Sequence, residues 1–285
     1  MTAADQIARD RRLQFIADVR PFRPVAIQLL RLIGDPLVGL DRIVSLLRAD
    51  PIISAQVLRL ANSPLLACRA EVKSILHALS LLGLDRLNVF IMTAAMRGLV
   101  DREQNVLTHA CWRHCLATAL LCERLSINVN LPAERCYIAG LLHDIGRLAL
   151  LHAFPGYGPA IHHSAMQGRD VLEAERELCG LDHCEAGRLL LGQWGCPLEL
   201  QSVAAWHESP RKAESVDGKL VFLVAACSEL AHAMHLATFP DTPPPEVRDI
   251  PVPFAEEARR QLVADFPTLA DWVITKVNGI ELSLL

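Results

Sequence analysis

A histidine and an aspartate stand side by side in an apolar segment of the sequence, GLLHDIGRL from Gly140 to Leu148. The residues on both sides of this segment are also apolar, so Asp144 is expected to be buried. A buried carboxylate without a partner costs on the order of several kcal/mol. The partner of Asp144 could be a metal ion, a histidinium or Arg147. A metal ion would make His143 and Asp144 ligands, whereas the other two partners would give a buried ion pair without a metal.

Further histidines in the second half of the chain could share a site with this pair. His114, His183 and His207 fall within separate predicted helices or at their ends. Helical bundles build metal sites in this way, from single side chains on several helices, and imidazole and carboxylate ligands suit Fe, Mn, Zn or Ni. Neighbouring residues on a helix point about 100° apart, so both residues of the pair reach one centre only if their helix passes directly beside it. The alternative is that these are ordinary core or surface histidines, like the remainder of the 11 in the chain.

The elements that must position these residues are helices almost throughout, because apolar residues recur with a helical period. Helices are predicted at residues 24–33, 40–48, 51–61, 75–83, 85–99, 106–125, 133–151, 170–179, 183–194, 197–206 and 219–236. The proline-rich stretch from Phe239 to Pro253 cannot be helical, and two short helices are expected after it, the last ending at Asn278-Gly279. Strands and helices do not alternate, so the predicted fold class is all-α.

Composition narrows the class of protein. Hydrophobic residues make up 52% of the 285 residues, enough for a large core, and the formal net charge of −4 argues against general binding to nucleic acid or to anionic membranes. The first residues are polar and resemble no signal peptide, and no apolar run approaches the roughly 20 residues of a membrane span. The nine cysteines form no CxxC pair and are expected to be reduced, as in a cytoplasmic protein. The spacing of Cys111 and Cys115 favours helix packing over a zinc site.

Six motifs, in order, give the chain a resemblance to the HDOD domain, a relative of the HD superfamily. They are ADPIISAQVLRLANSP from Ala49, SILHALSLLGLDRL from Ser74, WRH from Trp112, GLLHDIGRL from Gly140, LCGLDHCEAGRLLLGQWGCP from Leu178 and AAWHES from Ala204. The resemblance covers roughly residues 15–235. It implies an N-terminal helical lobe at residues 1–100 and an HD-like helical lobe at 101–236, with residues 237–285 forming the proline-rich connection and C-terminal helices.

The same resemblance implies a bacterial signalling role beside two-component or cyclic-dinucleotide systems. Catalytic HD proteins are metal-dependent phosphohydrolases, and the residues of this chain that match their metal-ligand positions are His114, His143, Asp144, His183 and His207. We expect the first four to converge in one pocket, with His207 at its edge.

The chain departs from the active HD relatives at places that matter for hydrolysis. Trp206 precedes His207 where the cyclic-dinucleotide hydrolases have a second histidine, and this tryptophan is expected near a substrate entrance. No GYP stretch follows Glu208, and the aspartate expected on a later helix falls on Ser228 or next to it. Two-metal hydrolysis needs both ions, so the site should hold one divalent metal ion, Fe, Mn, Zn or Ni, or none.

These observations predict a cytoplasmic regulatory module without catalytic residues, which acts by binding other signalling proteins. Nucleic acid and membrane partners are not expected. The alternative is a metal-dependent phosphohydrolase, a phosphodiesterase or phosphomonoesterase, that uses the remaining ligands.

Overall fold

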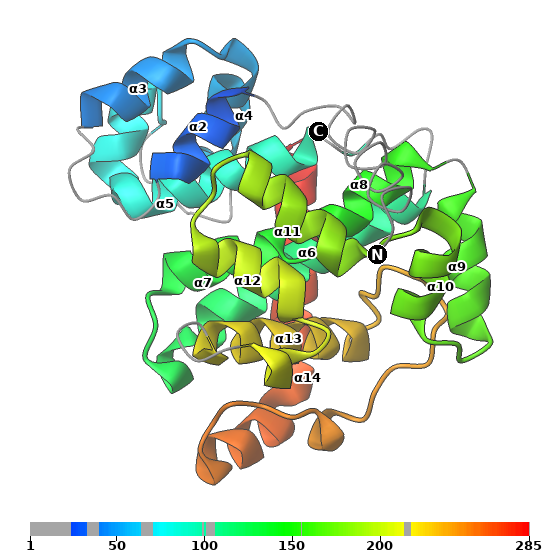
Figure 1. Cartoon of the computed structure of the whole chain (residues 1–285). Helices are drawn as coiled ribbons and strands as arrows, with labels where there is room; N and C mark the ends of the chain where they lie inside the picture. The colour runs from blue at the N-terminus through cyan, green and yellow to red at the C-terminus, as the bar shows by residue number, and fades with distance from the viewer. Residues whose placement is uncertain are drawn as a thin grey trace.

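The computed structural model describes residues 24–32, 40–63, 71–98, 100, 106–154, 156–213 and 218–284. Within these ranges the chain forms helices and loops and no strand, which confirms the all-α fold class. The first helices are α2 (Pro24–Leu32), α3 (Leu40–Arg48), α4 (Pro51–Ala61) and α5 (Ile75–Arg97). In Figure 1 they form a group at the upper left, in which α5 packs against α2, α3 and α4.

The helices that follow build the second part of the molecule. They are α6 (Val106–Leu125), α7 (Ala133–Leu142), α8 (Ile145–Ala153), α9 (Tyr157–Met166), α10 (Val171–Cys179), α11 (His183–Gln193), α12 (Leu198–Trp206), α13 (Gly218–Ala233) and α14 (Glu256–Ser283). Helix α6 lies at the centre and packs against α7, α13 and α14 (Figure 1). The predicted division into lobes near residue 100 stays a prediction.

Several helices begin where the sequence predicts, because a polar side chain caps them. Asp50 accepts hydrogen bonds from the backbone N–H groups of Ile52 and Ile53, both at 3.1 Å, and Pro51 occupies the first helical position. Ser74 caps α5 through the N–H of His77 at 3.1 Å. Gly83 has φ 76° and ψ 173°, which breaks α5 at the predicted helix end.

The helix predictions differ from the structure in three places. The helix expected at 133–151 is two helices, α7 and α8, separated by a turn at His143 and Asp144. Helix α9 was not predicted. The two short C-terminal helices are one helix, α14, which runs through Pro267 and past Gly279. It continues because Val273, Val277 and Glu281 on its inner face are buried, and because that glutamate binds His109 and Arg113 of α6.

One helix among the described residues is long and apolar enough to cross a membrane by length and composition alone, namely α5. The sequence-based expectation that no apolar run approaches this length therefore needs correction. The break at Gly83 divides the helix, and its second part, including Leu87, Ile91 and Met92, is buried in the protein core. Core packing accounts for its apolar character.

A close contact between α8 and α11 sets the geometry of the histidine cluster. A Cβ atom placed on Gly146 would lie 2.0 Å from the backbone oxygen of His183 and 2.4 Å from the backbone nitrogen of Gly187. The backbones of the two helices therefore touch at Gly146, next to Asp144 on one helix and at His183 on the other. No residue with a side chain fits there without moving one of the helices.

We predict that Gly146→Ala lowers the free energy of unfolding by about 1–3 kcal/mol, the usual cost of overpacking a close contact. Urea unfolding followed by circular dichroism measures the change. Gly218→Ala is the matched control, because an added Cβ at Gly218 meets nothing within 4 Å and alanine favours helix. Equal stability of both variants and the wild type would show that the contact is looser than described.

Candidate functional site

His143 and Asp144 form the corner between α7 and α8. Asp144 occupies the N-cap position of α8, yet its side chain makes no capping hydrogen bond to the helix. The carboxylate is instead turned into the interior, where only 2% of the residue is exposed. Because the chain turns between α7 and α8, the neighbouring side chains of His143 and Asp144 can both face one centre.

The partner of Asp144 is Arg147, one turn further along α8. Arg147 Nε donates to Asp144 Oδ2 at 2.9 Å, and Thr238 Oγ1 lies 3.5 Å from the same oxygen. Burial raises the pKa of Asp144, but Arg147 and then His183 outweigh it and hold the pKa well below its usual range. Of the three partners that the sequence allowed, the arginine is the one that makes a hydrogen bond. Oδ1 of Asp144 is buried and accepts none.

Glu175 of α10 ties this ion pair to His183. Its Oε2 accepts from the His183 backbone N–H at 2.8 Å and from Nδ1 of the same residue at 2.7 Å. Its Oε1 accepts from Tyr157 Oη at 2.6 Å and from Arg147 Nη1 at 3.1 Å. Because Nδ1 donates to Glu175, Nε2 carries the lone pair when His183 is neutral, and Arg147 Nη2 then donates to it at 2.9 Å. Burial and Arg147 lower the pKa of His183, but Cys184, Glu175 and Asp144 raise it well above its usual range, so a metal ion must also displace a proton here.

His143 offers a second lone pair at the same centre. Its Nδ1 donates to the backbone oxygen of Gly140 at 2.7 Å, whereas its buried Nε2 has no hydrogen-bond partner. Burial outweighs the opposing effect of Asp144 and lowers the pKa of His143 to about 3. The imidazole is therefore neutral at physiological pH, with Nε2 as an acceptor that no protein group fills.

The ring of His207 lies beside those of His143 and His183, with centroids 4.9 and 5.2 Å away, and its predicted place at the edge of the pocket stays a prediction. It is 4% exposed, and its Nε2 is 3.3 Å from His183 Nε2 and 3.6 Å from Asp144 Oδ1. Burial lowers the pKa of His207, but Cys184, Asp144 and Glu208 raise it to about 9. His207 therefore carries a proton at neutral pH, which a metal ion must displace.

His114 of α6 occupies the other end of the cluster. Its Nδ1 donates to the backbone oxygen of Leu236 at 2.8 Å, and its Nε2 accepts from Ser228 Oγ at 3.1 Å. Its ring centroid is 5.3 Å from that of His143. Burial lowers the pKa of His114, so this ring is neutral too. Ser228 is thus bonded to a histidine of the site, and its match to a ligand position stays a prediction.

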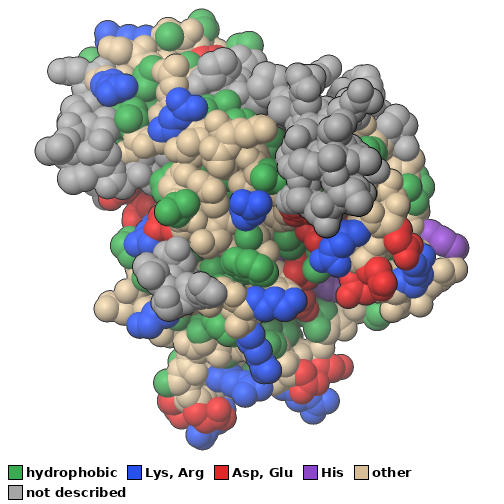
Figure 2. All heavy atoms as spheres, in the orientation of Figure 1, with side chains coloured by type: hydrophobic (Ala, Val, Ile, Leu, Met, Phe, Trp, Pro, Cys, Tyr) green, Lys and Arg blue, Asp and Glu red, His purple; other side chains and the backbone are tan. Residues whose placement is uncertain are grey.

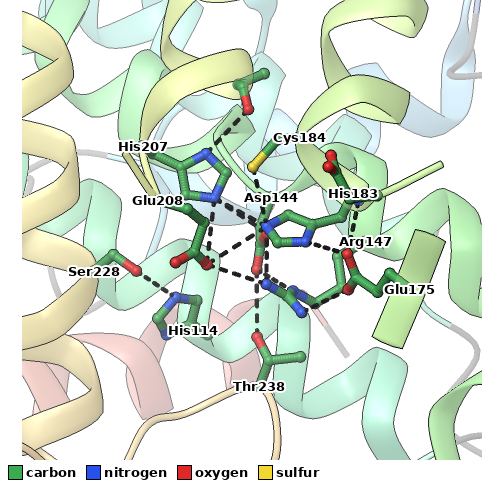
Figure 3. Close-up of polar contacts among 12 residues, drawn as sticks. His114, Asp144, Arg147, Glu175, His183, Cys184, His207, Glu208, Ser228 and Thr238 are labelled. Atoms are coloured by element: carbon green, nitrogen blue, oxygen red, sulfur yellow. Dashed lines mark hydrogen bonds and ion pairs between the residues drawn. The ribbon is translucent and has the colours of Figure 1, made fainter. Parts of the chain in front are cut away.

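The structure brings all five predicted site residues together, as Figure 3 shows for four of them. The ligand atoms of these five residues and of Cys184 fall into two groups, and within each group the atoms lie within 4.8 Å of one another. One group is His114, His143 and Asp144, and the other is His183, Cys184 and His207. A cavity of about 370 Å³ opens beside them, lined among others by His114, Asp144, Arg147, Glu208, Ser228 and Glu229. Trp206 is not among the residues that line this cavity and is 38% exposed, and its place near a substrate entrance stays a prediction.

Sequence reasoning missed three polar residues of the site. Glu175 follows Val171 and precedes Cys179 by four residues each, and this spacing along one buried helix face is a signal that could have found it. Cys184 and Glu208 directly follow predicted ligands, His183 and His207. Glu208 Oε1 lies 3.4 Å from Arg147 Nη2 and 3.5 Å from His183 Nε2.

These residues fit a divalent metal ion. Two buried acceptors, His143 Nε2 and Asp144 Oδ1, have no hydrogen-bond partner, and such atoms are costly unless a cation or donor compensates them. Imidazole and carboxylate groups are the donors that Fe, Mn, Zn and Ni accept. Glu175 and the backbone oxygens at Gly140, Val203 and Ala204 hold the rings in place, as outer ligands do in metal sites. The role of the five residues as ligands stays a prediction.

The model of the HDOD domain family matches residues 20–210 of the chain. An HDOD domain protein of unknown function from Geobacter sulfurreducens is 24% identical, with a TM-score of 0.75 over 93% of this chain and 97% of that one. A protein named as a candidate phosphohydrolase, from Shewanella amazonensis, is 25% identical, with a TM-score of 0.70 and 96% of each chain covered. A candidate signal transduction protein from Marinobacter aquaeolei is 18% identical, with a TM-score of 0.73 over 98% of this chain and 66% of that one. No curated protein matches the chain.

Removing the carboxylate of Asp144 should leave the buried Arg147 without its nearest partner. We predict that Asp144→Ala lowers the free energy of unfolding by about 3–5 kcal/mol without added metal. Glu177→Ala is the control, because Glu177 forms an ion pair with Arg169 at the surface and such pairs contribute about 1 kcal/mol or less. Urea unfolding curves of the three proteins, recorded with a chelator, decide. A loss for Asp144→Ala no larger than the control's would mean that Arg147 does not depend on this carboxylate.

Glu175 should act on metal binding through His183. Glu175→Gln keeps the size of the side chain but removes the charge that fixes the His183 ring, so we predict a roughly 10–100-fold weaker affinity for Zn²⁺. Competition with a chromophoric chelator gives the affinity. Glu173→Gln on the exposed side of the same helix should bind as the wild type does. Unchanged affinity of Glu175→Gln for Zn²⁺ would mean that His183 is not a ligand of the metal.

Proposed function

Because the chain belongs to the HDOD domain family, we propose that it works as a regulatory module that binds other signalling proteins and hydrolyses no substrate. The observation that carries this proposal is the place of Arg147. The guanidinium is 5% exposed and contacts Asp144, Glu175, His183 and Glu208, the groups that surround the ligand atoms (Figure 3). A fixed cation thus stands inside the cluster.

Charge balance limits the site to one metal ion. The buried carboxylates of Asp144 and Glu175, with Glu208 beside them, carry three formal negative charges, and Arg147 carries one positive charge. One divalent ion would bring these four side chains to neutrality, before any thiolate ligand is counted, whereas a second would leave two positive charges that they do not compensate. Unit charges 4 Å apart repel by about 4 kcal/mol at an effective dielectric constant of 20.

The ligand group that would hold a second ion, His114, His143 and Asp144, contains one carboxylate, and Arg147 already binds it. His114 Nε2 is bonded to the neutral hydroxyl of Ser228, at or next to the place where the HD resemblance leads us to expect an aspartate. A bound divalent ion would supply Lewis-acid chemistry, but hydrolysis with two ions needs one for the attacking and one for the leaving oxygen. The 25% identical relative from Shewanella amazonensis is named as a candidate phosphohydrolase, which makes hydrolysis the rival outcome.

A protein partner in a reducing compartment agrees best with the surface and the cysteines. On the described part of the face in Figure 2, basic side chains are scattered among acidic and apolar ones, and the net charge of the chain is −4. Nucleic acid and anionic membranes favour the opposite pattern. All eight described cysteines are buried, in keeping with core residues of a protein of the bacterial cytoplasm.

We predict that the purified protein hydrolyses no cyclic dinucleotide, nucleotide or simple phosphate ester with Mn²⁺, Fe²⁺, Mg²⁺ or Zn²⁺ added. The reason is that one ion cannot stabilise both the attacking and the leaving oxygen. The measurement is product formation by chromatography, together with metal content by elemental analysis. The expected metal content is at most one ion per chain.

The control for this screen is His143→Ala, purified in the same way. Any hydrolysis that the two proteins share comes from a contaminant. Turnover by the wild type that His143→Ala loses would overturn the proposal and establish a phosphohydrolase.

A further inference from the structure

We propose that Cys184 is a metal ligand and completes a four-coordinate site with His183, His207 and Asp144. The inference deepens the proposed function, because it explains how the site could bind an ion without hydrolysing a substrate. It rests on the proposed function only for the regulatory role. The nitrogen, sulfur and oxygen atoms of this set come from two positions on α11, the end of α12 and the corner before α8 (Figure 3).

The spacing of the ligand atoms fits a tetrahedral ion. His183 Nε2 lies 3.3 Å from His207 Nε2, 3.5 Å from Cys184 Sγ and 3.5 Å from Asp144 Oδ1. The distance from His207 Nε2 to Asp144 Oδ1 is 3.6 Å. Ligand bonds of about 2.0–2.3 Å in a zinc tetrahedron place neighbouring ligand atoms about 3.3–3.6 Å apart. These distances match four of the six edges of the tetrahedron. Sγ of Cys184 also lies within 4.8 Å of the ligand atom of His207, and the ion must draw this sulfur toward Asp144.

His183 Nε2 must exchange the hydrogen bond from Arg147 Nη2 for the ion, whereas Oδ1 of Asp144 has no hydrogen-bond partner to lose. Oδ1 of Asp144 accepts no hydrogen bond although the residue is 2% exposed, while Oδ2 is held by Arg147. Glu175 fixes His183 through Nδ1, and the backbone oxygens of Val203 and Ala204 accept from Nδ1 of His207. Each ring thus presents Nε2 to the common point, as ligands with a fixed tautomer do.

Cys184 occupies the second position of α11, where the helix favours negative charge. The residue is 5% exposed, so a thiolate there needs the ion as a counter-charge. When the ion binds, the thiol proton of Cys184, the proton on Nε2 of His207 and any proton on Nε2 of His183 pass to solvent, and nothing is oxidised or reduced. Arg147 Nη2 withdraws from His183 Nε2, and the bonds of Arg147 to Asp144 and Glu175 remain.

This donor set selects the metal and limits its chemistry. A thiolate favours Zn²⁺ over the harder Mn²⁺ and Mg²⁺. Four protein ligands close the tetrahedron, whereas catalytic zinc sites keep one position for water. The other group, His114, His143 and Asp144, offers no sulfur, and its His114 Nε2 already accepts from Ser228.

Cobalt substitution tests the proposal in the intact chain. We expect the wild type to bind one Co²⁺ with a thiolate-to-cobalt charge-transfer band and the intense visible bands of tetrahedral cobalt. Cys184→Ser should lose the charge-transfer band. It should also bind Zn²⁺ about 100-fold more weakly or worse, because removal of a residue that only holds a ligand in place already weakens metal binding by up to about this factor. Cys196→Ser, which changes another buried cysteine, should behave as the wild type. Cys184→Ala repeats the test if the serine variant does not fold.

Three results would overturn the proposal. The first is a wild-type cobalt spectrum without a thiolate band. The second is a thiolate band that survives in Cys184→Ser or Cys184→Ala. The third is an ion that these variants keep and His114→Ala loses, which would place it at the other group. None of them bears on the hydrolysis screen, so a failure here and a failure of the proposed function are separate findings.

Discussion

The buried ion pair of Asp144 and Arg147 is the interaction on which the rest of the site depends. It joins the corner before α8 to Glu175 of α10, and through that carboxylate to His183 at the start of α11. Breaking it would leave a charge in a region where neither partner is more than 5% exposed. The cost of such a charge, several kcal/mol, explains why helices distant in the sequence keep one arrangement around the histidines.

The same arrangement connects the site to the segment after α13. Thr238 lies near Asp144, the ring of Phe239 lies 5.3 Å from the Arg147 guanidinium, and His114 binds the backbone of Leu236. On its other side, α6 is bound to α14 through Arg113, the neighbour of His114. A change of charge at the centre therefore acts on contacts of both segments. In our proposal, the charges of the site hold these segments in place, and a partner protein detects a change in those charges.

The sequence predicts the fold class and the five clustered residues, because helical periodicity and motif order depend on local pattern. It does not predict the turn at His143 and Asp144, since an apolar run reads as one helix until its tertiary contacts are known. It favours a helix end at Asn278-Gly279, but the buried Glu281 and its bonds to α6 carry the helix further. Glu175 and Cys184 gain their meaning only from contacts across helices, which no single stretch of sequence contains.

The most direct test of the central claim is a crystal structure of the zinc-loaded protein, with anomalous scattering recorded at the zinc edge. Our account predicts one zinc peak, bonded to Asp144, His183, Cys184 and His207, with Arg147 still paired to Asp144 and Glu175. Two peaks bridged by Asp144, with a water between them, would contradict it and indicate a hydrolytic centre.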